Sequence, residues 1–138
     1  MNRFHLCVLA SDRPFYDGEC ESLILPTSDG LYGVQAHHRN TVAAVVAGVL
    51  RFRCPDGVEQ VAAVSRGIAR IENNDVLVLV DAAEHPEEID ENRALRSVEE
   101  AKERMIHRKS ARDYNAAQAR LSRALNRIKV KGLSEPKS

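Results

Sequence analysis

The chain has 138 residues, 43% of them hydrophobic, which is enough for one ordinary core or for a small domain with a helical appendage. Its 20 basic and 20 acidic side chains give zero net charge, which argues against binding of nucleic acid or of an acidic membrane surface through net positive charge. No apolar run approaches the ~20 residues that cross a bilayer, and no secretion or transit signal opens the chain, so we expect a soluble protein kept in the cytoplasm.

The cysteines and a histidine pair are the first candidates for metal binding. Cys7, Cys20 and Cys54 are an odd number without metal-ligand spacing, so neither a disulfide framework nor a zinc knuckle is indicated. His37 and His38 are also a poor metal site, because neighbouring residues of a strand point to opposite faces and further ligands are missing. We therefore expect reduced cysteines in strands or in the core, and no metal.

Short apolar stretches fill the first part of the chain, up to about residue 81, and turn-forming residues separate them. The turn signals are Asp17-Gly18, Asp29-Gly30, Pro55-Asp56-Gly57 and Asn73-Asn74-Asp75. They predict strands at 3–9, 19–25, 30–34, 42–46, 48–53, 58–64, 67–71 and 76–81. Short strands at this spacing favour an antiparallel β-sandwich or barrel over alternating βα units. Residues 76–80 are all apolar, so we expect this strand to lie centrally, between two packed sheets.

A helical periodicity begins after His85-Pro86. Ser110 is the predicted N-cap of the second of two helices, with Asp113 as its capping-box partner. The apolar stripes of both helices are narrow and rich in alanine, which suits a reversible contact better than a permanent core. The predicted fold class is therefore α+β, with an N-terminal antiparallel β-sandwich at 1–84, an antiparallel two-helix hairpin at 85–131 and a flexible tail at 132–138.

The charges are distributed unevenly between these parts. Residues 1–84 hold 7 basic and 11 acidic side chains, whereas residues 85–138 hold 13 and 9. The second predicted helix is the most basic part, because seven lysines and arginines accompany a single acid, Asp113, within 109–131. Such a helix is usually a solvated face, but it also suits docking against an acidic partner.

None of the common enzyme motifs occurs. The chain has no phosphate loop ending in Gly-Lys-Ser/Thr, no His-Glu-x-x-His helix and no Gly-x-Ser-x-Gly elbow. From the residues alone we expect a sandwich carrying a two-helix arm, which acts as an interaction module rather than as an enzyme.

The order of these features resembles the epsilon subunits of F-type ATP synthases from bacteria and chloroplasts. The opening segment FHLCVLASDRPFYDGECESLILPTSDGLYGV contains the family's Y-x-G and PT-x-DG-x-x-G elements. AGVLRFR, SRGIARIENNDVLVLVDAAE and the helical ending LSRALNRIKV follow in the family's order, so the resemblance covers nearly the whole chain. One loop departs from the family: residues 33–40 lack both prolines of the usual G-I-L-P-x-H-A-P, and His38 best matches its histidine.

The resemblance implies a non-catalytic subunit of the central stalk, without a catalytic cofactor. In similar proteins the sandwich binds the rotating γ subunit and the ring of c subunits, and the loop of His38 is an implied subunit contact. The hairpin inhibits ATP hydrolysis by docking on acidic segments of the α/β catalytic head, here through Arg120, Arg123 and Arg127. The implied location is peripheral, on the cytoplasmic face of the bacterial cell membrane, with membrane contact only through the complex.

Residues 89–94, Ile-Asp-Glu-Asn-Arg-Ala, match a motif that helps to bind regulatory ATP in some bacterial members of this family. The implied ligand-binding residues are Glu84, Ile89, Asp90, Arg93, Ala94, Arg123 and Arg127. The arginines among them would give charge-assisted hydrogen bonds to phosphate oxygens.

This ATP site is incomplete by comparison with the family. Two further basic positions of the pocket fall on Glu100 and Ala116, and Arg104 is a candidate substitute one turn beyond Glu100. Two alternatives stay open. Acids at 87–91 also suit any helix N-terminus, whether or not ATP binds, and the chain could act as a free-standing ATP-sensing module.

Overall fold

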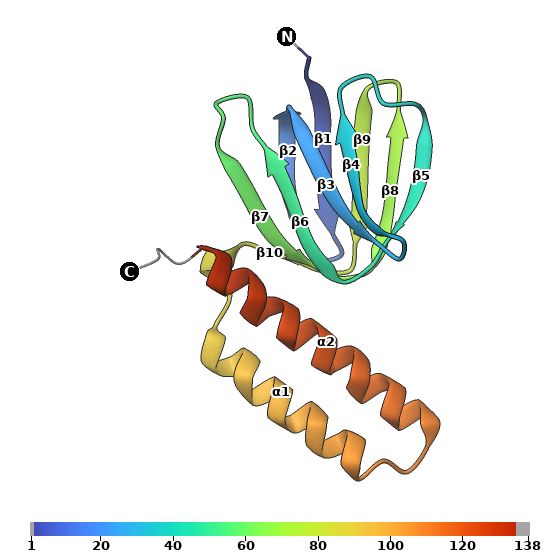
Figure 1. Ribbon diagram of the computed structural model, residues 1–138, viewed down its shortest axis with the longest axis vertical. Coiled ribbons are helices and arrows are strands. Elements are labelled where there is room, and N and C mark those ends of the chain that lie inside the picture. Colours follow the sequence, from blue (N-terminus) through green and yellow to red (C-terminus); the bar gives the residue numbers. More distant parts are fainter. Residues whose placement is uncertain (1, 135–138) are drawn as a thin grey trace. The chain divides into compact units, whose positions relative to one another are not determined.

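The computed structural model describes residues 2–134, which form two compact units with their boundary between His85 and Pro86 (Figure 1). The first unit is built of strands and the second of helices. The predicted α+β fold class, strands first and a helical pair second, is confirmed.

One continuous sheet path makes up the first unit. Its strand order is β10-β7-β6-β3-β5-β8-β9-β1-β2, and β4, which lies off this path, pairs with β3 over the whole length of that strand. All pairs are antiparallel except β1 with β9, and a single residue pair, Thr27 with Val45, joins β3 to β5. The path therefore bends at this junction into two facing layers. The strands are β1 (Phe4–Ala10), β2 (Pro14–Cys20), β3 (Ser22–Thr27), β4 (Gly30–Gln35), β5 (Thr41–Val45), β6 (Gly48–Arg53), β7 (Glu59–Val64), β8 (Gly67–Glu72), β9 (Asp75–Val80) and β10 (Ala83–Glu84).

Alternate side chains of the strands fill the core between the layers. Leu6 and Val8 of β1 and Val78 of β9 are fully buried, as are Leu25 of β3 and Phe52 of β6 from the other layer. Burial of each such side chain contributes about 1.5–3 kcal/mol to folding. Because side chains alternate along a strand, this inward set also fixes which residues point outward.

The predicted turn at Asp17-Gly18 is wrong, because both residues lie within β2 and pair with β1. The chain reverses earlier, at 11–13, where the Ala10 amide donates to the Arg13 carbonyl oxygen at 3.0 Å. β2 ends the sheet path and is largely exposed, and an end strand tolerates polar residues and glycine that a central strand would exclude. The predicted strand at 19–25 is in fact the end of β2 and the start of β3.

The other turn signals are confirmed by backbone conformation. Gly30 and Gly57 have φ of 111° and 86°, values that side chains rarely permit. Asn73 and Asn74, between β8 and β9, have φ of 51° and 65°. Two successive residues with positive φ form the hairpin turn whose twist matches that of the flanking strands, and asparagine tolerates it well.

Gly67 is the glycine with the tightest surroundings. A Cβ atom there would lie 1.9 Å from the Leu79 carbonyl oxygen, and backbone cannot move aside as a side chain can. We expect Gly67→Ala to lower the free energy of unfolding by roughly 3 kcal/mol or more. Gly33→Ala is the matched control, because a Cβ atom at Gly33 meets nothing within 4 Å. Urea denaturation measures both variants, and equal stabilities would contradict the close packing of β8 on β9.

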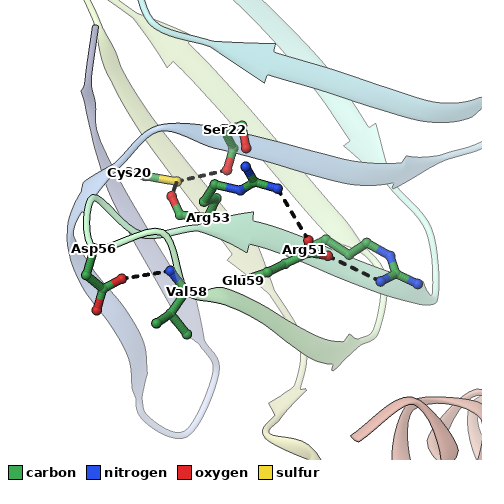
Figure 2. A network of polar contacts seen from close by, with 7 residues as sticks. All are labelled: Cys20, Ser22, Arg51, Arg53, Asp56, Val58 and Glu59. Carbon is green, nitrogen blue, oxygen red and sulfur yellow. Dashed lines mark hydrogen bonds and ion pairs between the residues drawn. The ribbon is translucent and has the colours of Figure 1, made fainter. Parts of the chain in front are cut away.

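A polar network holds the corner between β2 and β3 (Figure 2). The buried Cys20 thiol donates to the carbonyl oxygens of Ser22 and Arg53, at 3.0 and 3.4 Å. Its burial raises the pKa of Cys20 to about 11. Nearby, Asp56 accepts from the Val58 amide at 2.9 Å and shapes the β6–β7 turn. Cys7, Cys20 and Cys54 are all free thiols, so the corner is held by hydrogen bonds and packing.

The second unit is a helical hairpin of a short 3₁₀ turn, η1 (Pro86–Glu88), and two helices, α1 (Glu91–Ile106) and α2 (Ala111–Ser134). Asp90 caps α1 by accepting from the Arg93 amide at 3.2 Å, and Ser110 caps α2 by accepting from the Asp113 amide at 3.1 Å. The predicted cap at Ser110 and the predicted helix start at residues 87–94 are thus confirmed.

Small side chains line the contact between α1 and α2. Ala94 and Ala101 of α1 and Ala117 and Ala124 of α2 are buried, and they bury little area per residue. α2 continues to Ser134, past the predicted end at 131, and the rest of the predicted tail, 135–138, lies outside the described residues. Neither helix combines the length and the hydropathy of a bilayer-spanning segment.

Candidate functional site

The outward side of β5, β8 and β9 is an exposed apolar surface. Val42 is 69% exposed, Ile68 48% and Leu79 39%. Cross-strand register aligns them: Ala44 pairs with Ile68 and Ile68 with Leu79, whereas Val42 and Leu77 both pair with Arg70. Directly paired residues of neighbouring strands share one face of the sheet. We call this set the apolar outer face: Val42, Ala44, Ile68, Leu77 and Leu79.

This face corrects the prediction for residues 76–80. β9 does lie between two other strands, β8 and β1, but only its inward side chains are packed in the sandwich core. The outward side chains Leu77 and Leu79 are half-buried and exposed, respectively. The apolar run at 76–80 therefore has one side in the core and one side exposed. An exposed apolar patch of this kind marks an interaction surface.

Charged residues lie at one end of the apolar outer face, where Arg70 stands between Val42 and Leu77 on the same side of the sheet. His5 of β1 lies against Asp17 and, at 3.5 Å, against Asp75, and Arg70 lies 3.7 Å from Glu72. His5, Arg70, Glu72 and Asp75 line an open cavity of about 410 Å³. The described residues contain no group of three or more His, Cys, Asp or Glu side chains arranged for a metal ion. An apolar centre with a polar rim is the usual anatomy of a protein–protein contact.

The loop of His38 is held by hydrogen bonds rather than by prolines. His38 Nδ1 lies 2.8 Å from the Arg39 carbonyl oxygen, which can only accept, so Nδ1 carries the proton. In the neutral ring Nε2 accepts from the Tyr32 hydroxyl at 2.9 Å. The His37 amide donates to Asn74 of the β8–β9 turn at 2.7 Å, and His37 itself has φ of 62°. The loop thus has a defined shape without the family's two prolines.

The residues predicted to bind ATP are divided between the two units. Glu84 lies on β10, paired with Ala63 of β7. In the helical unit Ile89 is buried, the Asp90 carboxylate is used to cap α1, and Ala94 is buried. The Asp-x-x-Arg spacing therefore has a structural role in starting the helix, independent of any ligand.

Arg93, Arg123 and Arg127 lie at similar distances along the hairpin from the connection between α1 and α2. In an antiparallel hairpin, residues equally far from the connection lie opposite each other, which places Arg93 beside the turn of α2 that contains Arg123 and Arg127. Arg93 and Arg123 are exposed and Arg127 is half-buried. Arg120, Arg123 and Arg127 follow each other three or four residues apart, so they share one side of α2.

Two family domains match this chain in succession. The beta-sandwich domain of the ATP synthase delta/epsilon chain matches residues 3–86, and the long alpha-helix domain of the same chain matches residues 87–132. The chain belongs to the ATP synthase delta/epsilon chain family.

Full-length relatives support this membership. The chain is 42% identical to the "ATP synthase epsilon chain" of Ruminiclostridium cellulolyticum over 128 residues, which cover 93% of this chain and 95% of the relative. It is 38% identical to the epsilon chain of Caldicellulosiruptor bescii over 94% of both chains, and 38% identical to the plastid epsilon chain of Cuscuta reflexa over 91% of both. The resemblance noted in the sequence is thereby confirmed.

Solved structures with low identity share the fold. A chain of the Euglena gracilis mitochondrial ATP synthase superposes with a TM-score of 0.77 at 21% identity, covering 87% of this chain and 76% of that chain. A chain from the central stalk and c-ring of the Tetrahymena thermophila enzyme gives 0.63 at 11% identity, covering 92% and 95%. The fold is thus retained where few side chains are identical.

Sequence reasoning missed the apolar outer face of this epsilon-family chain. A signal was present, because Val42, Ile68 and Leu79 are apolar at positions where strict alternation would place polar residues. Of these positions, only Leu79 belongs to a run that the sequence analysis interprets, and that run, 76–80, predicts a strand between two packed sheets rather than a contact with a partner.

Proposed function

We propose that this chain is the non-catalytic epsilon subunit of an F-type ATP synthase, which couples ion-driven rotation of the central stalk to ATP synthesis. The observation that carries the proposal is the apolar outer face on a chain of this family, because such a face needs a protein partner. The γ subunit is the proposed partner of this face. The sandwich would also contact the ring of c subunits, in part through the loop of His38.

The second part of the proposal is that the hairpin inhibits ATP hydrolysis. Its support is the basic side of α2, where exposed Arg120 and Arg123 are followed by Arg127. Complementary charge fixes the register of a contact and suppresses wrong docking, so this side suits acidic segments of the α/β catalytic head.

The third part is that ATP acts as a regulatory ligand of the hairpin. Arg93, Arg123 and Arg127 lie at similar distances from the connection between α1 and α2, which allows them to bind one phosphate chain. The other proposed contacts are Glu84, Ile89, Asp90 and Ala94. ATP at about 100 times its dissociation constant would stabilise the hairpin conformation that binds it by roughly 2.7 kcal/mol.

We expect Arg93→Ala to weaken ATP binding by roughly tenfold, the cost of losing one charge-assisted hydrogen bond. Arg96→Ala is the matched control, because Arg96 is an exposed arginine of α1 outside the motif. Calorimetric titration of the purified subunit measures both. Absence of heat and of a thermal shift at several millimolar ATP would show that the chain does not bind the nucleotide. Equal losses of affinity in the two variants would show that Arg93 is not an ATP contact.

Copurification distinguishes this function from that of a free-standing ATP sensor. A stalk subunit copurifies with the γ subunit and with washed membranes, as expected for a peripheral protein that is held at the cytoplasmic face of the membrane through the complex. A sensor remains in the soluble fraction and binds ATP without γ. Affinity purification of the tagged chain from its own cells, with the γ subunit detected by mass spectrometry, decides between them.

A further inference from the structure

Asn74 joins three segments that meet at one end of the strand unit (Figure 1). They are the start of β1, the turn between β8 and β9 to which Asn74 belongs, and the loop of His38, which connects β4 to β5. The Asn74 Oδ1 atom accepts from the His37 amide at 2.7 Å, and its Nδ2 atom donates to the Arg3 carbonyl oxygen at 2.8 Å. The Asn74 carbonyl oxygen accepts from the His5 amide at 3.2 Å. One residue thus ties the loop of His38 to the paired strands β1 and β9.

The two hydrogen bonds of the Asn74 side chain require a carboxamide. A backbone amide can only donate and a carbonyl oxygen can only accept, so the two partners fix the orientation of the Asn74 amide. A carboxylate at this position would turn a second acceptor toward the Arg3 carbonyl oxygen, and an apolar side chain would satisfy neither partner. Asn74 is half-buried and has φ of 65°, a left-handed conformation that asparagine tolerates better than most residues. Residue type, backbone conformation and both partners therefore agree at this position.

Other hydrogen bonds shape the loop itself. The ring nitrogens of His38 are both used there, Nδ1 with the Arg39 carbonyl oxygen and Nε2 with the Tyr32 hydroxyl. Asn40 adds a second link to the β8–β9 turn, because its Oδ1 atom accepts from the Asn73 amide at 3.0 Å. The loop is therefore ordered from within, and Asn74 connects this ordered loop to the start of β1.

The family's usual loop contains two prolines, and this chain has neither of them within 33–40. Proline restricts the backbone covalently, whereas here a side chain from a distant turn restricts it by hydrogen bonds. We propose that Asn74 is a positioning residue for the contact with the ring of c subunits, because it holds the loop of His38 in a fixed position on β1 and β9. The inference rests on the proposed function, in which this loop contacts the ring. A loop that is ordered before it binds loses less conformational freedom at the contact, so its affinity is higher.

Asn74 also links the two surfaces that a stalk subunit needs. The strands on either side of its turn, β8 and β9, carry Ile68 and Leu79 of the apolar outer face, the proposed contact with γ. The loop of His38 is the proposed contact with the ring. Rotation passes through the sandwich only when both contacts move as one body. The hydrogen bonds of Asn74 fasten the loop to the strands that carry the γ contact.

Asn74→Gly is the test variant, because glycine keeps the positive φ and the backbone bond to His5 but removes both side-chain bonds. Asn73→Gly is the matched control. Asn73 has φ of 51°, its side chain is exposed, and in the described part of the chain it joins the loop through its backbone amide, which glycine retains. We expect hydrogen exchange of the His37 amide, followed by NMR in the full chain, to become roughly fivefold faster in Asn74→Gly and to stay unchanged in Asn73→Gly.

The functional arm measures the affinity of each chain for purified γ, and the affinity of each resulting complex for the purified c-ring in detergent. The affinity of Asn74→Gly for γ should change less than twofold, because the outward side chains of β8 and β9 are intact. Its affinity for the ring should fall by roughly fivefold or more, and that of Asn73→Gly should not.

Unchanged exchange of the His37 amide in Asn74→Gly, or equal ring affinities of the two variants, overturns the proposal. Parallel losses of affinity for γ and for the ring also overturn it, because they would show a defect of the whole strand unit. Failure of the proposed function gives a different result. In that case the complex of γ with the unmodified chain does not bind the ring, while exchange of the His37 amide still differs between the two variants.

Discussion

Replacing Ile68 and Leu79 together by lysine should abolish binding of this chain to its γ subunit while leaving the sandwich folded. Both side chains point outward from neighbouring strands and are paired across the ladder. Two charges placed at the centre of an apolar contact lose the buried area and remain unpaired there. Central contacts of this kind are worth about 2 kcal/mol or more each, so the affinity should fall by roughly 100-fold or more. Titration of purified γ with the variant measures the loss.

Val58→Lys is the control for this prediction. Val58 is 53% exposed but lies in the β6–β7 turn, away from the apolar outer face. It should bind γ as the unmodified chain does, and circular dichroism should show all three proteins folded. If the double variant retains full affinity, the γ subunit binds elsewhere on the sandwich.

Removing every residue after Glu88 should raise ATP hydrolysis by the assembled enzyme, because the proposed inhibitory hairpin is lost while the whole strand unit remains. Coupling between such an element and a distant active site typically corresponds to factors of about 5 to 150, so we expect an increase of roughly fivefold or more. Replacing Arg120, Arg123 and Arg127 by alanine should give much of this increase and leave α2 helical, since alanine has the higher helix propensity. Steady-state hydrolysis by complexes of equal subunit content is the measurement.

Arg120→Ala separates docking from nucleotide binding. Arg123 and Arg127 are shared by both proposed roles, which oppose each other: loss of ATP binding would free the hairpin to inhibit, whereas loss of the docking charge relieves inhibition. Arg120 has no proposed ATP contact, so its replacement should only raise hydrolysis. If the Arg120→Ala complex and the truncated complex both hydrolyse ATP at the unmodified rate, at low and at high ATP, the hairpin has no inhibitory role in this protein.

Features encoded within a few residues were predicted well from the sequence. The helix start near residues 87–91, the cap at Ser110 and the asparagine turn at 73–74 depend on local hydrogen bonds and on backbone conformation, so the residue types alone indicate them. The family resemblance rests on the order of many such local features. This is why it covered both units.

Features that depend on distant neighbours were predicted poorly. Asp17-Gly18 has the composition of a turn, yet pairing with β1 places it in an end strand. The apolar residues at 76–80 could not show whether their second side meets another sheet or solvent, because burial is decided by what packs there. Likewise, the sequence shows the basic residues of 109–131, but the lining of one cavity by Arg104 of α1 and Arg120 of α2 depends on the antiparallel pairing of the two helices.

Calorimetric titration of the purified γ subunit with the full chain, and with a chain ending at His85, tests the central claim most directly. The account predicts a one-to-one complex with a dissociation constant of about 1 μM or tighter for both, since the apolar outer face belongs entirely to the strand unit. The shorter chain should bind within about tenfold of the full chain, because roughly 1.4 kcal/mol would then be the most that the helices contribute. Binding by the full chain alone, or by neither when both are folded, would contradict a γ-binding sandwich.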